Sequence, residues 1–289
     1  MSTLFSPPTE KCLHAKAGHT LRCVWAPVML AIVGAIAAAV PESGARAQLG
    51  AIEDRPNHVI ADLKLELIWI KAGTFTMGSA ATEAGRNKAE GLQMIVTLTK
   101  GFWLGKTTVT QAQYEALIGS NPSTFKEVGP DGPVENVSWL DAMAFCRKLN
   151  DRERAAGRLP PGYAYTLPTE AQWEYACRAG TTGPYAGNPE TMAWHKENSG
   201  GTTHPVGQKQ PNAWGLRDMY GNVLQWCSDW YGDYPGGVLT DPTGPERGHY
   251  RMARGGSWRV GLFRSASRSG GSSGRRDYTI GFRLALAAE

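Results

Sequence analysis

The sequence predicts one α+β domain with much irregular loop. Three capped apolar segments predict helices, and short runs with a period of two predict strands. After Gly180 the chain is rich in glycine, proline and aromatic residues and has no helical period. The 289 residues are 42% hydrophobic, which supplies a sizeable core and excludes intrinsic disorder. No regular repeat and no internal linker divides this domain.

Residues 1–47 have the pattern of a secretory signal peptide. A polar stretch with three basic residues precedes an apolar run over 24–40, and Ala45 and Ala47 stand at the −3 and −1 positions of a cleavage site. The unbroken part of the run, 28–40, is short for a membrane span. We therefore expect an exported protein, periplasmic or secreted, with no stable membrane span after cleavage. An uncleaved membrane anchor is the alternative.

Short strands are expected at the start of the domain. Residues 48–64 are expected to be a linker before a domain over 65–287. Over 63–69, Leu63, Leu65 and Leu67 alternate with other residues, as in a half-buried strand. Further along the chain, apolar runs at 95–98 and 102–104 are also predicted to be strands.

Three helices are predicted by their N-terminal caps. Thr110, Ser138 and Thr169 each precede residues that form an apolar helical face. Gln113 and Gln172 stand three residues after the first and third of these caps. In such a capping box the hydroxyl and the amide side chain satisfy each other's backbone N–H groups.

Seven motifs occur in order along the domain. They are GTFTMGS at 73–79, PVENVSW at 133–139, LPTEAQWEYA at 167–176, NAWGL at 212–216, GNV at 221–223, RGGSW at 254–258 and GFR at 281–283. Together they resemble the sulfatase-modifying factor family, that is, the formylglycine-generating enzyme domain. The resemblance implies a single compact α+β fold with little regular secondary structure, remotely like C-type lectins.

The resemblance also implies a chemistry that this chain lacks the residues to perform. The family's enzymes oxidise a sulfatase cysteine to formylglycine, using oxygen and a copper ion held by two cysteines after the Gly-Gly-Ser motif. The matching stretch here, 257–265, is shorter and contains no cysteine, and none follows Cys227. Copper(I) needs soft thiolate ligands, so copper is not expected.

Three cysteines follow the predicted leader: Cys146, Cys177 and Cys227. In the family's animal enzyme, the counterparts of Cys146 and Cys177 form disulfides with cysteines near the C-terminus. Leu284 and Ser265 occupy the matching places of those partners here. We therefore expect buried free thiols, with a Cys146–Cys177 disulfide as the alternative.

A loop that begins at Asp218 matches a calcium-binding loop of the family. The resemblance assigns as ligands the side chain of Asp218 and the backbone carbonyls of Met219, Gly221 and Val223, which suit a hard cation. Gln225 stands where many relatives have glutamate, which removes one negative charge. Calcium is the cofactor that the resemblance implies. A loop closed by hydrogen bonds alone is the alternative.

Arginines crowd the C-terminal segment, with eight arginines and no lysine over 251–289. The candidates for a ligand groove are Arg254, Ser257, Trp258, Arg259, Arg264 and Arg268. They lie around the place where the family keeps its substrate groove, and the planar guanidinium suits carboxylate, phosphate or sulfate. The alternative is structural pairing with acids such as Asp229, Asp233 and Glu246.

These observations predict an exported member of the family that binds a peptide, protein or glycan in the former substrate groove. No catalytic residue can be assigned. The alternative is an oxidoreductase of the same family that acts on a protein or small molecule by a cysteine-independent mechanism, and a third hypothesis is a structural partner in an envelope complex. The net charge of +4 does not indicate nucleic acid as a partner.

Overall fold

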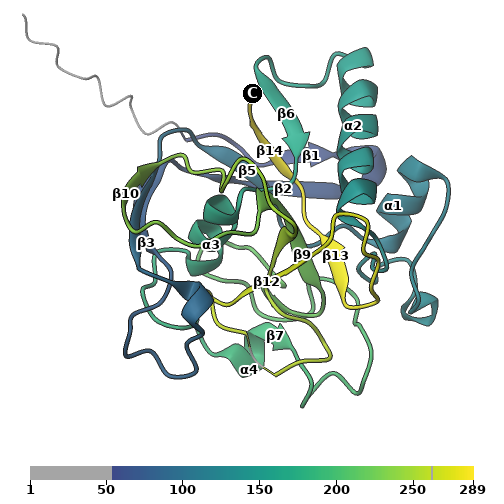
Figure 1. The fold of residues 1–289 in the computed structure, drawn as a ribbon. Coiled ribbons are helices and arrows are strands. Elements are labelled where there is room, and N and C mark those ends of the chain that lie inside the picture. Colours follow the sequence, from purple (N-terminus) through teal and green to yellow (C-terminus); the bar gives the residue numbers. More distant parts are fainter. Residues whose placement is uncertain (1–53, 262) are drawn as a thin grey trace, which may run out of the picture. The chain divides into compact units, whose positions relative to one another are not determined.

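The computed structural model describes residues 54–261 and 263–289 (Figure 1). The predicted leader over 1–47 and the first part of the expected linker lie outside these residues. The predicted α+β class is confirmed, with short strands in several sheets and few helices. Within the described ranges, no helix is long and apolar enough to cross a membrane.

A five-stranded sheet joins the two ends of the described chain. Its order is β1–β2–β5–β14–β6, and all neighbours are antiparallel. The strands are β1 (His58–Ile60), β2 (Leu65–Ile70), β5 (Phe102–Gly105), β14 (Ala285–Ala288) and β6 (Tyr163–Thr166). Because β14 lies between β5 and β6, the last strand of the chain completes the sheet that the first strands begin.

Three smaller sheets complete the strand structure. One has the order β10–β4–β3, another β12–β11–β9–β13, and the third pairs β7 with β8. Their strands are β3 (Gly73–Met77), β4 (Met94–Leu98), β7 (Ala193–Trp194), β8 (Tyr220–Gly221), β9 (Leu224–Trp230), β10 (Gly237–Thr240), β11 (Arg251–Arg254), β12 (Arg268–Gly271) and β13 (Ile280–Phe282).

The three predicted helices and their caps are confirmed. They are α1 (Gln111–Ile118), α2 (Trp139–Ala155) and α3 (Glu170–Arg178). The helix α2 also has a complete capping box, because the Asp141 carboxylate accepts a hydrogen bond from the Ser138 amide at 2.8 Å. A single turn, α4 (Pro189–Met192), and three short 3₁₀ helices, η1 (Ala61–Leu63), η2 (Lys88–Glu90) and η3 (Lys126–Val128), complete the helical structure of the described ranges.

The expected linker over 48–64 is wrong in its last part. His58–Ile60 forms β1, which pairs antiparallel with β2 so that Ile60 lies opposite Leu65. Ile60 and Leu63 are both buried in the core. The domain therefore begins earlier than expected, because these two apolar side chains are buried by packing against the sheet. Leu63 belongs to η1, so the predicted strand starts at Leu65 instead.

Both faces of the five-stranded sheet are buried. Alternate residues of a strand point to opposite faces, and Trp103 and Leu286 belong to one hydrophobic cluster while Leu104 and Ala285 belong to a second. The first cluster includes residues of α1 and α2, and the second includes residues of α3, β3 and β4. Figure 1 shows α1 and α2 on one side and α3 with β3 and β10 on the other.

The three cysteines are buried free thiols, as predicted. Cys146 lies in the first cluster together with Leu284, whereas Cys177 and Cys227 lie in the second. The alternative of a Cys146–Cys177 disulfide is therefore wrong. Ser265 is buried, and its hydroxyl lies 2.8 Å from the hydroxyl of Tyr220.

The Gly-Phe-Arg motif generates a test of this packing. A Cβ added at Gly281 would lie 2.3 Å from the carbonyl oxygen of Val134, and backbone atoms cannot yield easily. We expect Gly281→Ala to lower the free energy of unfolding by about 2 kcal/mol or more, measured by urea denaturation. Gly274→Ala is the matched control, since no heavy atom lies within 4 Å of its added Cβ. Equal urea midpoints for the two variants would contradict this packing.

Candidate functional site

One face of α3 carries buried charges. Glu170, Glu174 and Arg178 are spaced by four residues, so they share one face of the helix. All three are at most 4% exposed. Arg178 donates to the Glu174 carboxylate at 2.9 Å and to the carbonyl of Gly78 at 2.8 Å. This face therefore needs further cations from other elements to balance its two carboxylates.

Arg254 supplies one of these cations. Its guanidinium is fully buried, forms an ion pair with Glu174, and donates to the carbonyls of Ala266 and Ser267 at 2.9 and 2.6 Å. It thereby joins α3 to the segment between β11 and β12. The expectation that Arg254 binds a ligand is wrong, because its guanidinium is enclosed by groups of its own chain.

Arg268 supplies the second cation. Two of its nitrogens donate to the two oxygens of Glu170 at 2.7 and 2.8 Å, which is a bidentate pair. Its third nitrogen donates to the carbonyl of Ala89 at 2.8 Å. The donors of Arg268 are therefore also occupied by groups of its own chain, and the expectation that it binds an anionic ligand is wrong.

Arg264 is paired in the same way. It forms ion pairs with Glu90 and Glu83 and donates to the carbonyl of Gly85 at 2.7 Å. Structural pairing, the alternative of the sequence analysis, is thus what the structure shows for three of the arginines. The partners differ from those expected: they lie on α3, on η2 and at Glu83.

The other three candidates lie in the short stretch after the Gly-Gly motif. Ser257 is buried, and Trp258 is 9% exposed. The Trp258 indole donates to the carbonyl of Tyr278 at 3.3 Å, and its ring centroid lies 5.2 Å from that of Phe125. Of the six groove candidates only Arg259 is exposed. Ser257 and Trp258 are therefore packed against their own chain, whereas a ligand role for the exposed Arg259 stays a prediction.

The loop expected to bind calcium is closed by hydrogen bonds. The Asp218 carboxylate accepts from the amide of Gly207 at 2.7 Å, and its carbonyl accepts from Gln225 at 2.7 Å and from Arg283 at 3.2 Å. Arg283 is fully buried, and its positive charge stabilises the negative charge of Asp218. A divalent cation here would meet the like charge of Arg283. The hydrogen bonds of Asp218 fit the alternative of a closed loop, and calcium at Asp218, Met219, Gly221 and Val223 stays a prediction.

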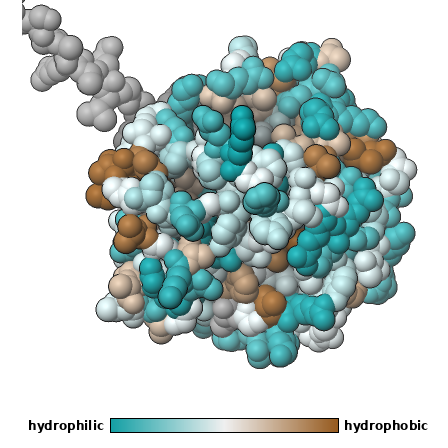
Figure 2. All heavy atoms as spheres, viewed as in Figure 1, coloured by the Kyte–Doolittle hydropathy of each residue, from teal (hydrophilic) through white to brown (hydrophobic). Residues whose placement is uncertain are grey.

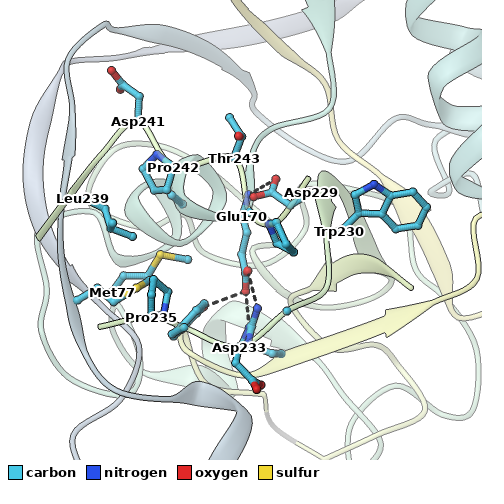
Figure 3. Close-up of a pocket in the computed structure, with 17 residues that line it drawn as sticks. Met77, Glu170, Asp229, Trp230, Asp233, Pro235, Leu239, Asp241, Pro242 and Thr243 are labelled. Atoms are coloured by element: carbon cyan, nitrogen blue, oxygen red, sulfur yellow. Dashed lines mark hydrogen bonds and ion pairs between the residues drawn. The ribbon is translucent and has the colours of Figure 1, made fainter. Parts of the chain in front are cut away.

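A cavity of about 470 Å³ lies beside the N-terminus of α3 (Figure 3). Met77 of β3, Met94 of β4 and Leu239 of β10 form apolar walls. The segment 231–245, which contains β10, lines it with further residues, including three prolines. Figure 3 shows these side chains arranged around the opening, with Glu170 and Asp229 between them.

The buried polar groups of this cavity are Glu170, Arg268 and Asp229. Glu170 is neutralised by Arg268 and also accepts from the Tyr234 hydroxyl at 2.9 Å. Asp229 is 4% exposed, and its Oδ2 accepts from the Glu170 amide at 2.9 Å and the Ser228 hydroxyl at 3.0 Å. Burial, together with repulsion by Glu170, raises the pKa of Asp229 to about 7.

Two further hollows adjoin the cavity. A wider one of about 650 Å³ shares Asp233 and Tyr234 with it, and one of about 280 Å³ shares Pro242 and Thr243. The three together follow the segment 231–245, and we call them the 231–245 groove. Such a row of neighbouring hollows suits an extended ligand better than a compact one.

The sequence analysis did not predict this groove. Of its residues, only Arg268 was a candidate, and Asp229 and Asp233 were considered only as partners for arginines. A signal was present, since 231–245 holds four glycines and three prolines in a long irregular segment. Long loops on a rigid scaffold often carry binding sites.

Removal of Glu174 tests whether the arginines are structural. Glu174→Ala removes the nearer ion-pair partner of the buried Arg254 and leaves only the longer pair with Glu170 at 3.7 Å, and we expect the free energy of unfolding to fall by about 3–5 kcal/mol. Arg154→Ala is the control, because the pair of Arg154 with Asp151 is exposed and should contribute less than about 1 kcal/mol. Chemical denaturation measures both losses, and similar losses would show that Arg254 does not depend on Glu174.

Calcium can be tested by thermal unfolding. Because Arg283 already compensates Asp218, we expect the Tm in EDTA to be unchanged when calcium is restored in excess. A ligand that binds the folded state raises Tm with its concentration. A calcium-dependent rise that Asp218→Asn abolishes would establish the calcium site instead.

Comparison with known proteins agrees with the motifs. Residues 57–288 match the model of the sulfatase-modifying factor enzyme 1-like domain. The chaperone protein LppX of Paenibacillus barcinonensis is 30% identical over 263 residues, which cover 73% of this chain and 84% of LppX. The formylglycine-generating enzyme of Streptomyces coelicolor is 34% identical over 184 residues, or 55% of this chain. The aligned part spans 54% of that enzyme, about half of its length.

Solved structures share the fold. Treponema denticola variable protein 1 superposes with a TM-score of 0.70 at 30% identity, covering 80% of this chain and 98% of that protein. PvdO from Pseudomonas aeruginosa gives a TM-score of 0.70 at 26% identity, covering 82% and 99%. With the seven motifs, the matched domain and the shared fold, the chain belongs to the family of sulfatase-modifying factor, or formylglycine-generating enzyme, domains.

Proposed function

We propose that this protein binds a segment of another polypeptide in the 231–245 groove and does not form formylglycine. The observation that supports binding is the groove itself, which comprises three neighbouring hollows and combines apolar walls with a buried carboxylate. Binding sites in proteins are concave and mostly apolar, with a few placed polar groups. The ligand thus binds in the cavity that Arg268 lines, and not at the segment around Arg254.

The thiols support the absence of the family's oxidation chemistry. Cys146, Cys177 and Cys227 are at most 1% exposed, and burial raises the pKa of Cys146 to about 12 and that of Cys177 to about 11. Copper ligation and thiol oxidation both proceed through the thiolate. None of these three thiols is therefore poised to hold copper or to meet a substrate.

A polypeptide fits the groove better than a glycan. Methionine, leucine and proline side chains form the walls, and methionine adapts to varied apolar partners. Exposed apolar side chains continue from the groove: Leu92 lines its widest hollow, and Val238 lies opposite Ile95 in the pairing of β10 with β4. Figure 2 shows hydrophobic side chains gathered at the left edge, over β10 in Figure 1. The relative LppX is described as a chaperone protein, which agrees with a polypeptide ligand.

Export is part of the same proposal. The leader-like pattern over 1–47 supports cleavage after Ala47 and a place outside the cytoplasm. Free thiols are exposed to oxidation in such compartments. Burial of all three thiols in the described domain makes them compatible with that environment.

The binding proposal is tested with an array of unstructured 15-residue peptides and fluorescence anisotropy on those retained. Leu92→Asn replaces the apolar contact in the wide hollow with an uncharged polar side chain, and we expect about fivefold weaker binding, equivalent to roughly 1 kcal/mol. Leu140→Asn is the matched control, since Leu140 is also exposed but lies on α2. Equal weakening by both variants, or no retained peptide, would overturn the groove as the binding site.

The proposed absence of formylglycine formation is tested by oxygen uptake. We expect purified protein incubated with copper(I) and a cysteine-containing sulfatase peptide to show no peptide-dependent oxygen uptake. Stoichiometric copper with such uptake would favour the alternative, an oxidoreductase of this family.

A further inference from the structure

We propose that the cavity beside α3 selects a basic side chain of the bound polypeptide, whose cationic group contacts Oδ1 of Asp229. This inference rests on the proposed function, because it names the chemistry that the 231–245 groove recognises. It concerns a site away from the copper-binding stretch that the family uses, and four observations carry it.

The first observation is that Asp229 forms no direct ion pair, although the charge of Arg251 acts on it from a greater distance. Glu170, next to it in the cavity, has a bidentate arginine, and Glu174 has two arginines. Asp229 forms no ion pair with any described residue, and both hydrogen bonds that it accepts from other residues use Oδ2. A buried carboxylate without a cation is unfavourable, so a ligand that supplies a positive charge gains affinity here.

The second observation is that Asp229 lines the cavity and accepts no hydrogen bond from another described residue at Oδ1. Gly244 lines the same cavity. A Cβ at Gly244 would lie 3.2 Å from Oδ1 and 3.0 Å from the Asp229 Cβ. Gly244 therefore packs closely against Asp229, and a larger residue at this position would collide with it. Gly244 also has a φ of +74°, which suits glycine.

The third observation is the charge of the lining. Its carboxylates are Glu170, Asp229, Asp233 and Asp241, and its one cation is Arg268, which is held by Glu170. A cavity with an excess of carboxylates attracts cations and repels acidic ligands.

The fourth observation is the shape of the walls. Met77, Met94 and Leu239 line the same cavity as Asp229 with apolar groups. Lysine buries its aliphatic stem along apolar surface while its ammonium reaches a polar partner. A cavity that combines apolar walls with a buried carboxylate suits both parts of that side chain.

The hydrogen bond from the Glu170 amide gives Asp229 a structural role as well, because it caps the first turn of α3. Asparagine caps a helix about as well as aspartate does. Asp229→Asn therefore keeps the cap and removes only the charge, which makes it the variant that separates the two roles.

The charge of Asp229 also gives the site a pH dependence. The titratable and charged groups around Asp229 are Glu170 on α3, Cys227 on β9, Arg251 on β11, Arg268 on β12, and Asp233 and Tyr234 in the segment 231–245. The pKa of Asp229 is raised to about 7, so its carboxylate is mostly ionised at pH 8 and mostly neutral at pH 6. Lysine stays charged over this range. Affinity for a lysine peptide should therefore fall as the pH falls, by about tenfold between pH 8 and pH 6.

The test uses three labelled 15-residue peptides with the same leucine-rich frame and four lysines, four glutamines or four glutamates. Fluorescence anisotropy at pH 8 should rank lysine above glutamine above glutamate. Lysine-peptide affinity should fall about tenfold at pH 6, while glutamine-peptide affinity stays constant. In Asp229→Asn the lysine preference and its pH dependence should disappear, with glutamine-peptide binding and Tm retained.

Asp233→Asn is the matched control, because Asp233 is an exposed carboxylate at the rim of the same cavity. It should lower lysine-peptide affinity less than Asp229→Asn and leave the pH dependence in place. Equal affinity for the lysine and glutamine peptides, or a lysine preference that survives in Asp229→Asn, would overturn the inference while leaving peptide binding intact. Binding of none of the three peptides would instead count against the groove itself.

Discussion

The buried carboxylate of Glu174 is the point on which three parts of the fold depend. It pairs with Arg254 of β11, accepts from Arg178 on its own helix, and accepts from the amide of Gly78 at 2.8 Å at the end of β3. Each partner comes from a different sheet or helix, so one side chain fixes their relative positions. A buried charge without partners is far more costly than an apolar residue, and these elements are therefore held in one arrangement.

This network also determines which charged groups of the cavity remain available to bind a ligand. Glu170 lies one turn before Glu174 and meets Arg268, so its charge is balanced before any ligand arrives. Asp229 lies close to the same carboxylate but receives only an amide and a hydroxyl. The arginines that were expected to bind a ligand thus neutralise carboxylates of their own chain. Their neutralisation leaves one buried carboxylate to define the character of the groove.

The sequence predicted those features whose causes are local. The caps Thr110, Ser138 and Thr169 predict their helices because a cap and its partner lie within one turn. The arginine pairs could not be derived in this way, because Arg268 and Glu170 are 98 residues apart and Arg254 and Glu174 are 80 apart. The four-residue spacing of charges on α3 was visible, but no local rule states which segment covers that face. The groove depends on the same long-range packing and was missed for the same reason.

Leu284 and Ser265, at the places where the resemblance implies cysteine partners, are both part of the buried structure. Leu284 joins the core cluster around Cys146, and Ser265 bonds to Tyr220, whose hydroxyl also interacts with the Cys177 thiol. Packing and hydrogen bonding thus hold these two places without a covalent link. In the stretch after Gly256, Trp258 packs against Phe125. The 231–245 groove combines apolar walls with a carboxylate, and this supports recognition of a ligand there.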